Sequence, residues 1–290
     1  MERAAHEPVP PRGFVLAGIK PGPEATRVIV YAARQAVIRH ADGLRLLHAG
    51  VEDPAQTGWL ASHAEDVRAD FPGLPVDTLV QEAEASAALI EQAATARLVV
   101  VGPPGRGLSR LLNRSVAFGV AGGASCPVTV LRDWPARGGP VTAAVGDPAR
   151  DRTVLETAAG EADLRHTALL ILHADMRPQP LPPGLAPPGQ QSQKGVLLAE
   201  RRFLQEEAAF LRGRWPGLTT DIQVASSAAP LALLQTSRDA ALLVIGGPRR
   251  GHRIRPGSTT SELLRHGQCP VMVVPRRPDR RSEGSGRGRT

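Results

Sequence analysis

An internal repeat is the feature of this sequence that most limits its fold. Four segments occur twice in the same order, at 14–36 and 140–162, 44–50 and 169–175, 96–107 and 240–251, and 125–132 and 268–275. The second pair ends in Leu-His-Ala, the third runs from apolar residues into a glycine loop, and the fourth contains Cys-Pro-Val. Matching anchors in matching order indicate a tandem duplication, so each half should form the same fold.

Each half alternates short apolar runs with helical stretches. The runs at 98–101 and 242–245 are apolar at every position, which is typical of strands buried on both faces of a parallel sheet. The expected strands lie near 14–19, 44–49, 76–81, 97–101 and 127–132, and near 141–145, 168–173, 220–225, 241–245 and 270–275. The predicted fold class is α/β, with two tandem, open, parallel, five-stranded α/β sandwiches of Rossmann-like type.

The repeat also predicts the domain organisation. A short Pro/Gly linker should join the two domains, and an irregular, Pro- and Gln-rich insertion should lie on the surface of the second. The predicted boundaries are a disordered N-terminus at 1–12, domains at 13–133 and 140–275, the linker at 134–139, the insertion at 176–195 and a basic disordered tail at 276–290.

The tail carries most of the excess positive charge. Six arginines and two acidic residues give it a net charge of +4 out of +7 for the chain. Aromatic residues are only 3% of the composition, so the stacking platforms that single-strand binders use are missing. We therefore expect no nucleic-acid partner and interpret the tail as a solvated basic segment.

The chain shows no sign of a membrane span or a signal peptide. No run approaches 18 apolar residues, and the first residues, MERAAHEPVPPRGF, lack a continuous apolar stretch. The two cysteines, Cys126 and Cys269, are too few for a disulfide framework. We expect a cytoplasmic protein without a membrane partner.

A glycine-rich loop, GPPGRGLSRLLNRSV at 102–116, follows the apolar run at 98–101. Loops between a strand and a helix often hold phosphate, because the helix N-terminus presents free N–H groups and glycines let the backbone come close. Two interpretations stay open. The loop either binds a nucleotide weakly or keeps its glycines only for a tight turn.

With these segments, the chain resembles a tandem universal stress protein over about residues 13–275. The resemblance rests on the strand-turn-helix entry, the Leu-His-Ala strand ending, the glycine loop and the Cys-Pro-Val final strand. It implies an adenine-nucleotide alpha hydrolase-like fold that binds ATP in some members. It also implies an Asp after the first strand for the adenosine, and a loop of Gly, two residues, Gly, nine residues, Gly and Ser or Thr for the phosphates.

The first half matches this pattern in part. Gly102 and Gly105 match the first two glycines, and Ser115 matches the hydroxyl position. Arg114 replaces the third glycine, in a loop one residue short, and Lys20 replaces the Asp. An ammonium cannot accept the hydrogen bonds that a carboxylate accepts, and an unpaired ligand donor costs about 1–3 kcal/mol. Arginine is itself a good phosphate donor, so we expect weak ATP binding here.

The second half departs further. Gly246, Gly257 and Ser258 match the loop pattern, but Arg249 replaces the second glycine and the loop is shorter still. Gly146 stands at the place of the Asp. We expect no nucleotide in this half.

The sequence points to binding and not to turnover. It contains no Ser/His/Asp or Cys/His set, no metal-ligand cluster and no Walker loop, so we predict no catalytic and no metal residues. Two mechanisms remain open. Either nucleotide occupancy changes how an unknown protein partner binds, or decayed sites leave a constitutive interaction module. A nucleotide-hydrolysing or adenylyl-transferring enzyme is a distant third alternative. The resemblance further implies that the final strands pair in an internal pseudo-dimer, from which a higher oligomer could form.

Four further residues occupy equivalent places in the two halves. His48 and His173 end the second strand of each half, and we interpret them as hydrogen-bonded structural histidines. Cys126 and Cys269 precede the final strands and are interpreted as small buried residues.

Overall fold

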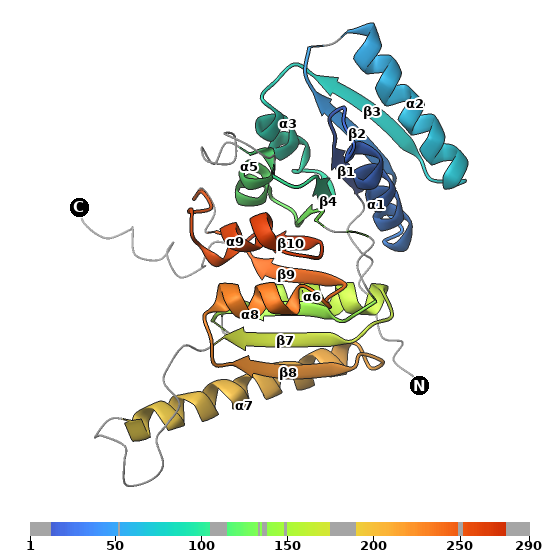
Figure 1. Ribbon diagram of the computed structural model, residues 1–290. Coiled ribbons are helices and arrows are strands. Elements are labelled where there is room, and N and C mark those ends of the chain that lie inside the picture. The colour runs from blue at the N-terminus through green and yellow to red at the C-terminus, as the bar shows by residue number, and fades with distance from the viewer. Residues whose placement is uncertain are drawn as a thin grey trace, which may run out of the picture. The chain divides into compact units, whose positions relative to one another are not determined.

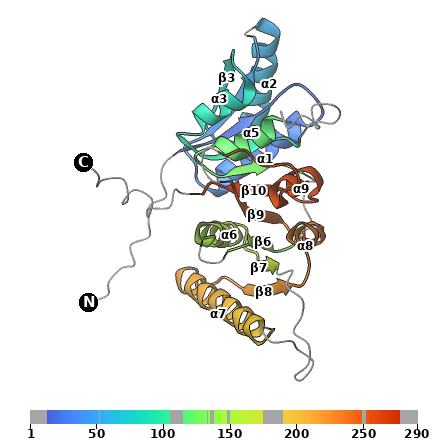
Figure 2. The same ribbon diagram turned by 90° about the vertical axis from the view of Figure 1, so that its left-hand side faces the viewer.

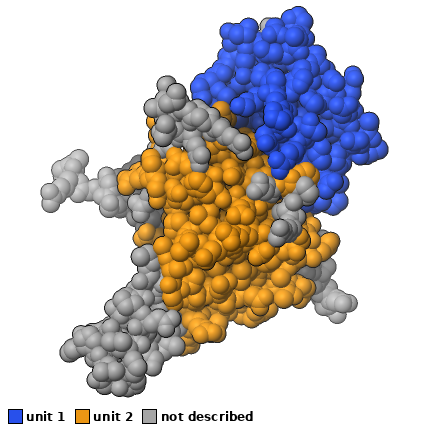
Figure 3. Space-filling model, viewed as in Figure 1, with its two compact units in different colours: residues 1–100 blue, residues 101–290 orange. Residues whose placement is uncertain are grey.

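The computed structural model describes residues 13–51, 53–104, 115–132, 134, 138–147, 150–174, 190–248 and 252–276. The chain forms two compact units, Met1–Val100 and Val101–Thr290 (Figure 3). The predicted N-terminal segment, the tail beyond Arg276 and most of the predicted insertion lie outside the described residues. The domain boundaries drawn from the repeat stay a prediction.

The first unit contains a parallel sheet with helices between its strands (Figure 1). Its elements are β1 (Phe14–Gly18), α1 (Ala25–Ile38), β2 (Leu44–Ala49), α2 (Pro54–Asp70), β3 (Val76–Gln81), α3 (Ala85–Gln92) and β4 (Ala96–Val101). The strand order is β3-β2-β1-β4, and β2 pairs in parallel with both β1 and β3. Each strand therefore needs a crossover helix, as the alternating sequence pattern predicted.

The helices of this unit form where the sequence supplies an apolar face and a cap. One face of α1 is buried through Val28, Ile29, Ala32 and Ala36, whose spacing of three and four residues brings them to the same side of a helix. In α2 the Asp53 side chain caps the first turn by accepting from the Gln56 N–H at 2.8 Å.

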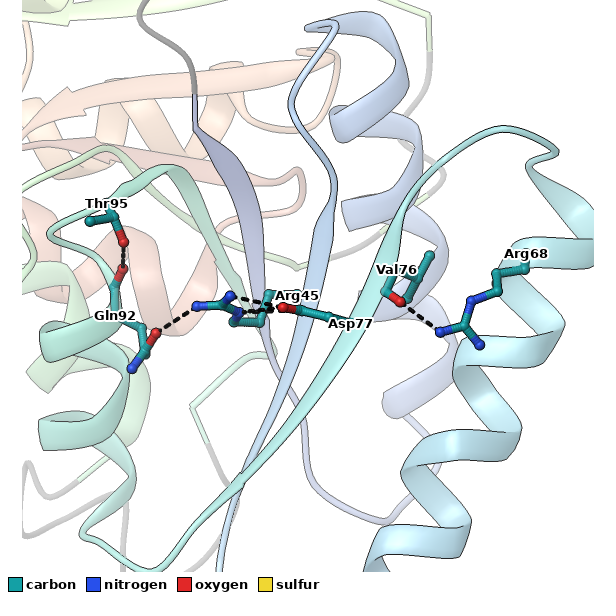
Figure 4. A network of polar contacts seen from close by, with 6 residues as sticks. All are labelled: Arg45, Arg68, Val76, Asp77, Gln92 and Thr95. Carbon is teal, nitrogen blue, oxygen red and sulfur yellow. Dashed lines mark hydrogen bonds and ion pairs between the residues drawn. The ribbon is translucent and has the colours of Figure 1, made fainter.

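A polar network holds the edge strand β3 from both sides (Figure 4). Arg45 of β2 donates to the Asp77 carboxylate of β3 at 2.8 Å from Nη2, and to the Gln92 side chain of α3 at 2.9 Å from Nη1. Arg68 of α2 donates to the Val76 carbonyl at 2.6 Å. The paired carboxylate and guanidinium fix the register of two neighbouring strands beyond their backbone ladder.

The second unit holds the rest of the described elements. They are α5 (Val116–Gly123), β5 (Val128–Val130), β6 (Val141–Val145), α6 (Arg152–Leu164), β7 (Leu169–Ala174), α7 (Gln190–Arg214), β8 (Thr220–Ala225), α8 (Ala229–Thr236), β9 (Leu242–Gly246), α9 (Thr259–His266) and β10 (Val271–Val274). The strand order is β5-β10-β9-β6-β7-β8. Figure 2 shows α6 and α7 on one side of these strands and α8 and α9 on the other.

All strand pairs of the second unit are parallel except the pair of β5 with β10. The ten predicted strands are all present close to their predicted places, although β5 has only three residues. The α/β fold class is confirmed.

The final strands of the two repeats pair with each other, as the resemblance implied. Val128 lies opposite Val273 and Val130 opposite Val271 in the antiparallel ladder, and all four side chains are buried. Beyond the ladder, Arg132 Nε donates to the Gly267 carbonyl at 3.1 Å. Pairing removes the open edge that either final strand would otherwise present.

One expectation about the second repeat needs correction. The stretch 176–195 was predicted to be irregular, but α7 begins at Gln190, so its last six residues are helical. The last proline of the stretch is Pro188, and glutamine is a good helix former, so nothing after that proline opposes a helix.

Two glycines of the first unit give a paired prediction. A Cβ on Gly43 would lie 2.7 Å from the Pro75 carbonyl oxygen, whereas a Cβ on Gly58, inside α2, would meet nothing within 4 Å. Gly43→Ala should therefore destabilise the protein, and Gly58→Ala should stabilise it by about 0.8 kcal/mol through helix propensity. Urea unfolding of both variants checks this, and equal effects would contradict it.

Candidate functional site

Open α/β sheets bind ligands beyond the carboxyl ends of their strands, at the point where the strand order reverses. In the second unit this point lies between β6 and β9, which are neighbours, because the chain continues from β6 to β7 on one side and from β9 to β10 on the other. Gly146 follows β6 and Gly246 ends β9. These residues border the crevice in which a ligand of the second repeat would be sought.

A buried carboxylate occupies this crevice. Asp151, at the start of α6, is only 2% exposed. Its Oδ2 accepts hydrogen bonds from the backbone N–H groups of Gly146 at 2.9 Å and Asp147 at 3.0 Å. The side chain thus turns back toward β6, and it makes no capping bond to the first turn of its own helix.

The other oxygen of this carboxylate binds a cation from the end of β10. Arg276 Nη2 donates to Asp151 Oδ1 at 2.9 Å. A Cβ on Gly246 would lie 3.1 Å from Arg276 Nε and 3.4 Å from Asp151 Oδ1, so the glycine makes room for the ion pair. The protein therefore fills the crevice of its second repeat with its own carboxylate and guanidinium.

The first repeat has no equivalent carboxylate. The buried faces of α1 and α6 correspond residue by residue, with Val28 and Ile29 matching Val154 and Leu155. In this alignment of the two repeats, Ala25 is the residue equivalent to Asp151, and Ala25 is also buried. The two repeats thus differ at one buried position beside the crevice.

The sequence is similar to that of known proteins over most of its length. The sequence matches the Universal stress protein family over residues 14–132 and 139–275. The chain belongs to this family. A universal stress protein of Mycolicibacterium smegmatis is 27% identical over 90% of this chain and 96% of its own length.

A solved structure of the family shares the fold. A universal stress protein from Archaeoglobus fulgidus covers 91% of this chain and 96% of its own, with a TM-score of 0.62 and 16% identity. Another, from the same organism and in complex with dAMP, aligns with 47% of this chain and 97% of its own, with a TM-score of 0.34 and 22% identity.

In the first repeat, the universal stress protein residues are only partly described. Lys20 is exposed two residues after β1, Gly102 follows β4, and Ser115 stands at the N-cap of α5. The Ser115 side chain makes no capping hydrogen bond to the helix. Gly105 and Arg114 lie outside the described residues.

In the second repeat, the matched residues serve the backbone. Gly257 has a φ of +74°, a left-handed conformation that favours glycine. Ser258 caps α9, accepting from the Ser261 N–H at 3.3 Å and donating to the Arg255 carbonyl at 2.7 Å. The Ser258 hydroxyl therefore both donates and accepts within its own turn, whereas the Ser115 hydroxyl makes no capping bond to α5. Arg249 lies outside the described residues.

The two equivalent histidines are structural, as predicted. His48 Nδ1 donates to the Ile19 carbonyl at 3.0 Å, and His173 Nδ1 donates to the Val145 carbonyl at 2.9 Å. Both are buried, and each ties the end of the second strand of its repeat to the end of the first. The predicted burial of Cys126 and Cys269 is confirmed too, and the two form no disulfide.

The described residues contain neither a metal-ligating group nor a membrane-spanning helix. No group of three or more His, Cys, Asp or Glu residues there could hold a metal ion. Within the same ranges, no helix combines the length and the apolar character needed to cross a membrane.

Sequence reasoning missed both members of the ion pair. Arg276 was assigned to the solvated tail, and this is corrected by its bond to Asp151, 125 residues earlier. Asp151 stood unnoticed at the start of a helix. Aligning the two repeats would have singled out Asp151. Its equivalent in the first repeat is a buried alanine, and a carboxylate is unusual at such a core position.

The ion pair gives a stability prediction. Asp151→Ala leaves two backbone N–H groups and Arg276 without their acceptor, so the free energy of unfolding should fall by about 2 kcal/mol. Arg150→Ala breaks only the exposed pair with Asp147 at 3.3 Å and should change it by less than about 0.5 kcal/mol. Urea unfolding measures both, and an Asp151→Ala protein as stable as Arg150→Ala would show that the pair contributes little.

Proposed function

We propose that this universal stress protein is a non-enzymatic stress-response protein that binds an adenine nucleotide weakly, and only in its first repeat. One observation carries the proposal. The Asp151–Arg276 pair fills the crevice of the second repeat, whereas the first repeat has Ala25 in place of that carboxylate. The duplication therefore leaves one candidate nucleotide site and one closed crevice.

The closed crevice resists a nucleotide because its donors are already paired. The Gly146 and Asp147 N–H groups and Nη2 of Arg276 all donate to Asp151, so a nucleotide in this crevice would find these donors already used. A nucleotide would have to displace a carboxylate that is 2% exposed, and each hydrogen bond to a charged group is worth about 1.5–3 kcal/mol.

The first repeat keeps part of what a nucleotide needs. Ser115 makes no capping bond to α5, so its hydroxyl is not committed to the helix N–H groups as that of Ser258 is. Lys20 is exposed and can donate to a phosphate, but it cannot accept a hydrogen bond from an adenine amino group or a ribose hydroxyl. Weak binding with poor selectivity for the adenosine part is the expected result.

In this proposal nucleotide occupancy changes how the protein binds a partner, and no chemical turnover is required. The described residues contain no metal-ligating cluster, which is consistent with a binding role but does not test it. A cytoplasmic location belongs to the same proposal. If neither repeat binds nucleotide, the paired final strands would favour a constitutive interaction module.

Restoring the missing acceptor tests the proposal directly. ATP titrated into the full-length protein by calorimetry should bind weakly, and Lys20→Asp should raise the affinity at least five-fold, because it supplies the acceptor. Gly146→Asp introduces a carboxylate at the equivalent place of the second repeat and should add no site, because Asp151 and Arg276 already fill that crevice.

Two outcomes would contradict the proposal. Absence of binding at millimolar ATP in both the parent protein and Lys20→Asp would favour the constitutive module. A second binding site created by Gly146→Asp would show that the ion pair does not close the crevice.

A further inference from the structure

A cleft of about 240 Å³ lies in the second unit where the two repeats join. Its walls come from the last turn of α5 and the residues after it, from the first two turns of α6, and from the ends of β9 and β10. The lining residues used below are Gly122, Gly123, Thr153, Thr157 and Arg276.

The cleft borders the crevice of the second repeat through Arg276, but it does not include the nucleotide positions of the family pattern. None of the glycines, serines or other residues that the resemblance assigns to ATP lines it. Two of its walls, α5 and α6, belong to different repeats, and the β5–β10 pair brings them together. A single repeat could not form this cleft.

One wall carries a positive charge. Among the described residues, Arg276 is the only charged one that lines the cleft, and 37% of its side chain is exposed. Asp151 engages its Nη2 end, and Nε is buried without an acceptor among the described residues. The Nη1 group of this partly exposed guanidinium is left to donate to an anion, and a phosphate oxygen suits such a donor.

The α6 wall presents hydroxyl groups. Thr153 is exposed, and Thr157 donates to the Thr153 carbonyl at 2.7 Å. Because its proton is used in that bond, the Thr157 oxygen faces a ligand as an acceptor.

The α5 wall presents carbonyl oxygens. The last turn of a helix leaves carbonyl groups without intrahelical donors, and Gly122 and Gly123 stand in that turn with no side chain to cover them. This wall therefore suits hydrogen-bond donors such as ligand hydroxyl groups. It does not suit the anion itself, because the C-terminal end of a helix is the negative end of its dipole.

We propose that this cleft binds a small phosphate monoester that also carries hydroxyl groups. The phosphate group pairs with Arg276, and the hydroxyl groups donate to Thr157 and to the α5 carbonyl groups. Ligand pockets for drug-sized molecules run from about 300 to 1,000 Å³, so a cleft of about 240 Å³ suits a smaller molecule. The site is independent of nucleotide binding in the first repeat.

Calorimetry on the full chain with glycerol 3-phosphate tests the proposal. Glycerol 3-phosphate should bind saturably in the millimolar range. Inorganic phosphate, which has no polyol, should bind about five-fold or more weakly, and glycerol, which has no anion, should not bind. ATP at saturation should not displace glycerol 3-phosphate, which separates this site from the proposed nucleotide site.

Matched variants locate the site. Thr157→Val removes the acceptor on α6 and should weaken glycerol 3-phosphate binding about five-fold. Thr236→Val is the control, because Thr236 makes the same bond to the carbonyl four residues earlier, at 3.0 Å, on α8 outside the cleft. The double variant Asp151→Asn/Arg276→Gln removes the cation without leaving a buried carboxylate unpaired, and it should abolish binding.

The proposal is overturned if no saturable binding of glycerol 3-phosphate is seen. It is also overturned if Thr157→Val and Thr236→Val bind the ligand equally well, or if the double variant, shown to be folded by circular dichroism, keeps the affinity of the parent.

Discussion

The antiparallel pair of β5 and β10 is the interaction on which the rest of the second unit depends. It is a short ladder, because β5 has three residues, yet its valines are buried throughout. Each final strand would otherwise expose a row of unpaired backbone groups, which is an aggregation hazard. By pairing them, the duplication satisfies both edges within one chain and brings α5 of the first repeat against the crevice side of the second.

Once the repeats are joined in one chain, they are free to diverge. The position held by Ala25 in the first repeat and Asp151 in the second shows this at a single buried residue. A buried carboxylate is costly without partners, and here two backbone N–H groups and Arg276 supply them. Because Arg276 stands two residues after β10, the ion pair ties the end of this strand to the start of α6, so the same contact serves stability and closes the crevice.

The fold was predictable from the sequence, and the decisive contact was not. Strands β4 and β9 were predictable because each contains a continuous apolar run. They occupy equivalent places in the two repeats, so each supports the prediction of the other. The Asp151–Arg276 pair joins residues that no local pattern connects, and Arg276 stands at the head of an arginine-rich tail that hides its role. The mistake about residues 190–195 had a local cause, since a proline-rich stretch was extended past its last proline.

The second repeat shows why a glycine pattern is a weak indicator of nucleotide binding. Gly246 is needed because a Cβ there would press on the Arg276 guanidinium, and Gly257 is needed because its φ is +74°. Ser258 is needed as the cap of α9. All three residues match the universal stress protein loop, and each has a structural role in the folded chain that does not require a nucleotide. The residue beside the crevice therefore distinguishes the two repeats where the loop pattern does not. It is a buried carboxylate in the second repeat and a buried alanine in the first.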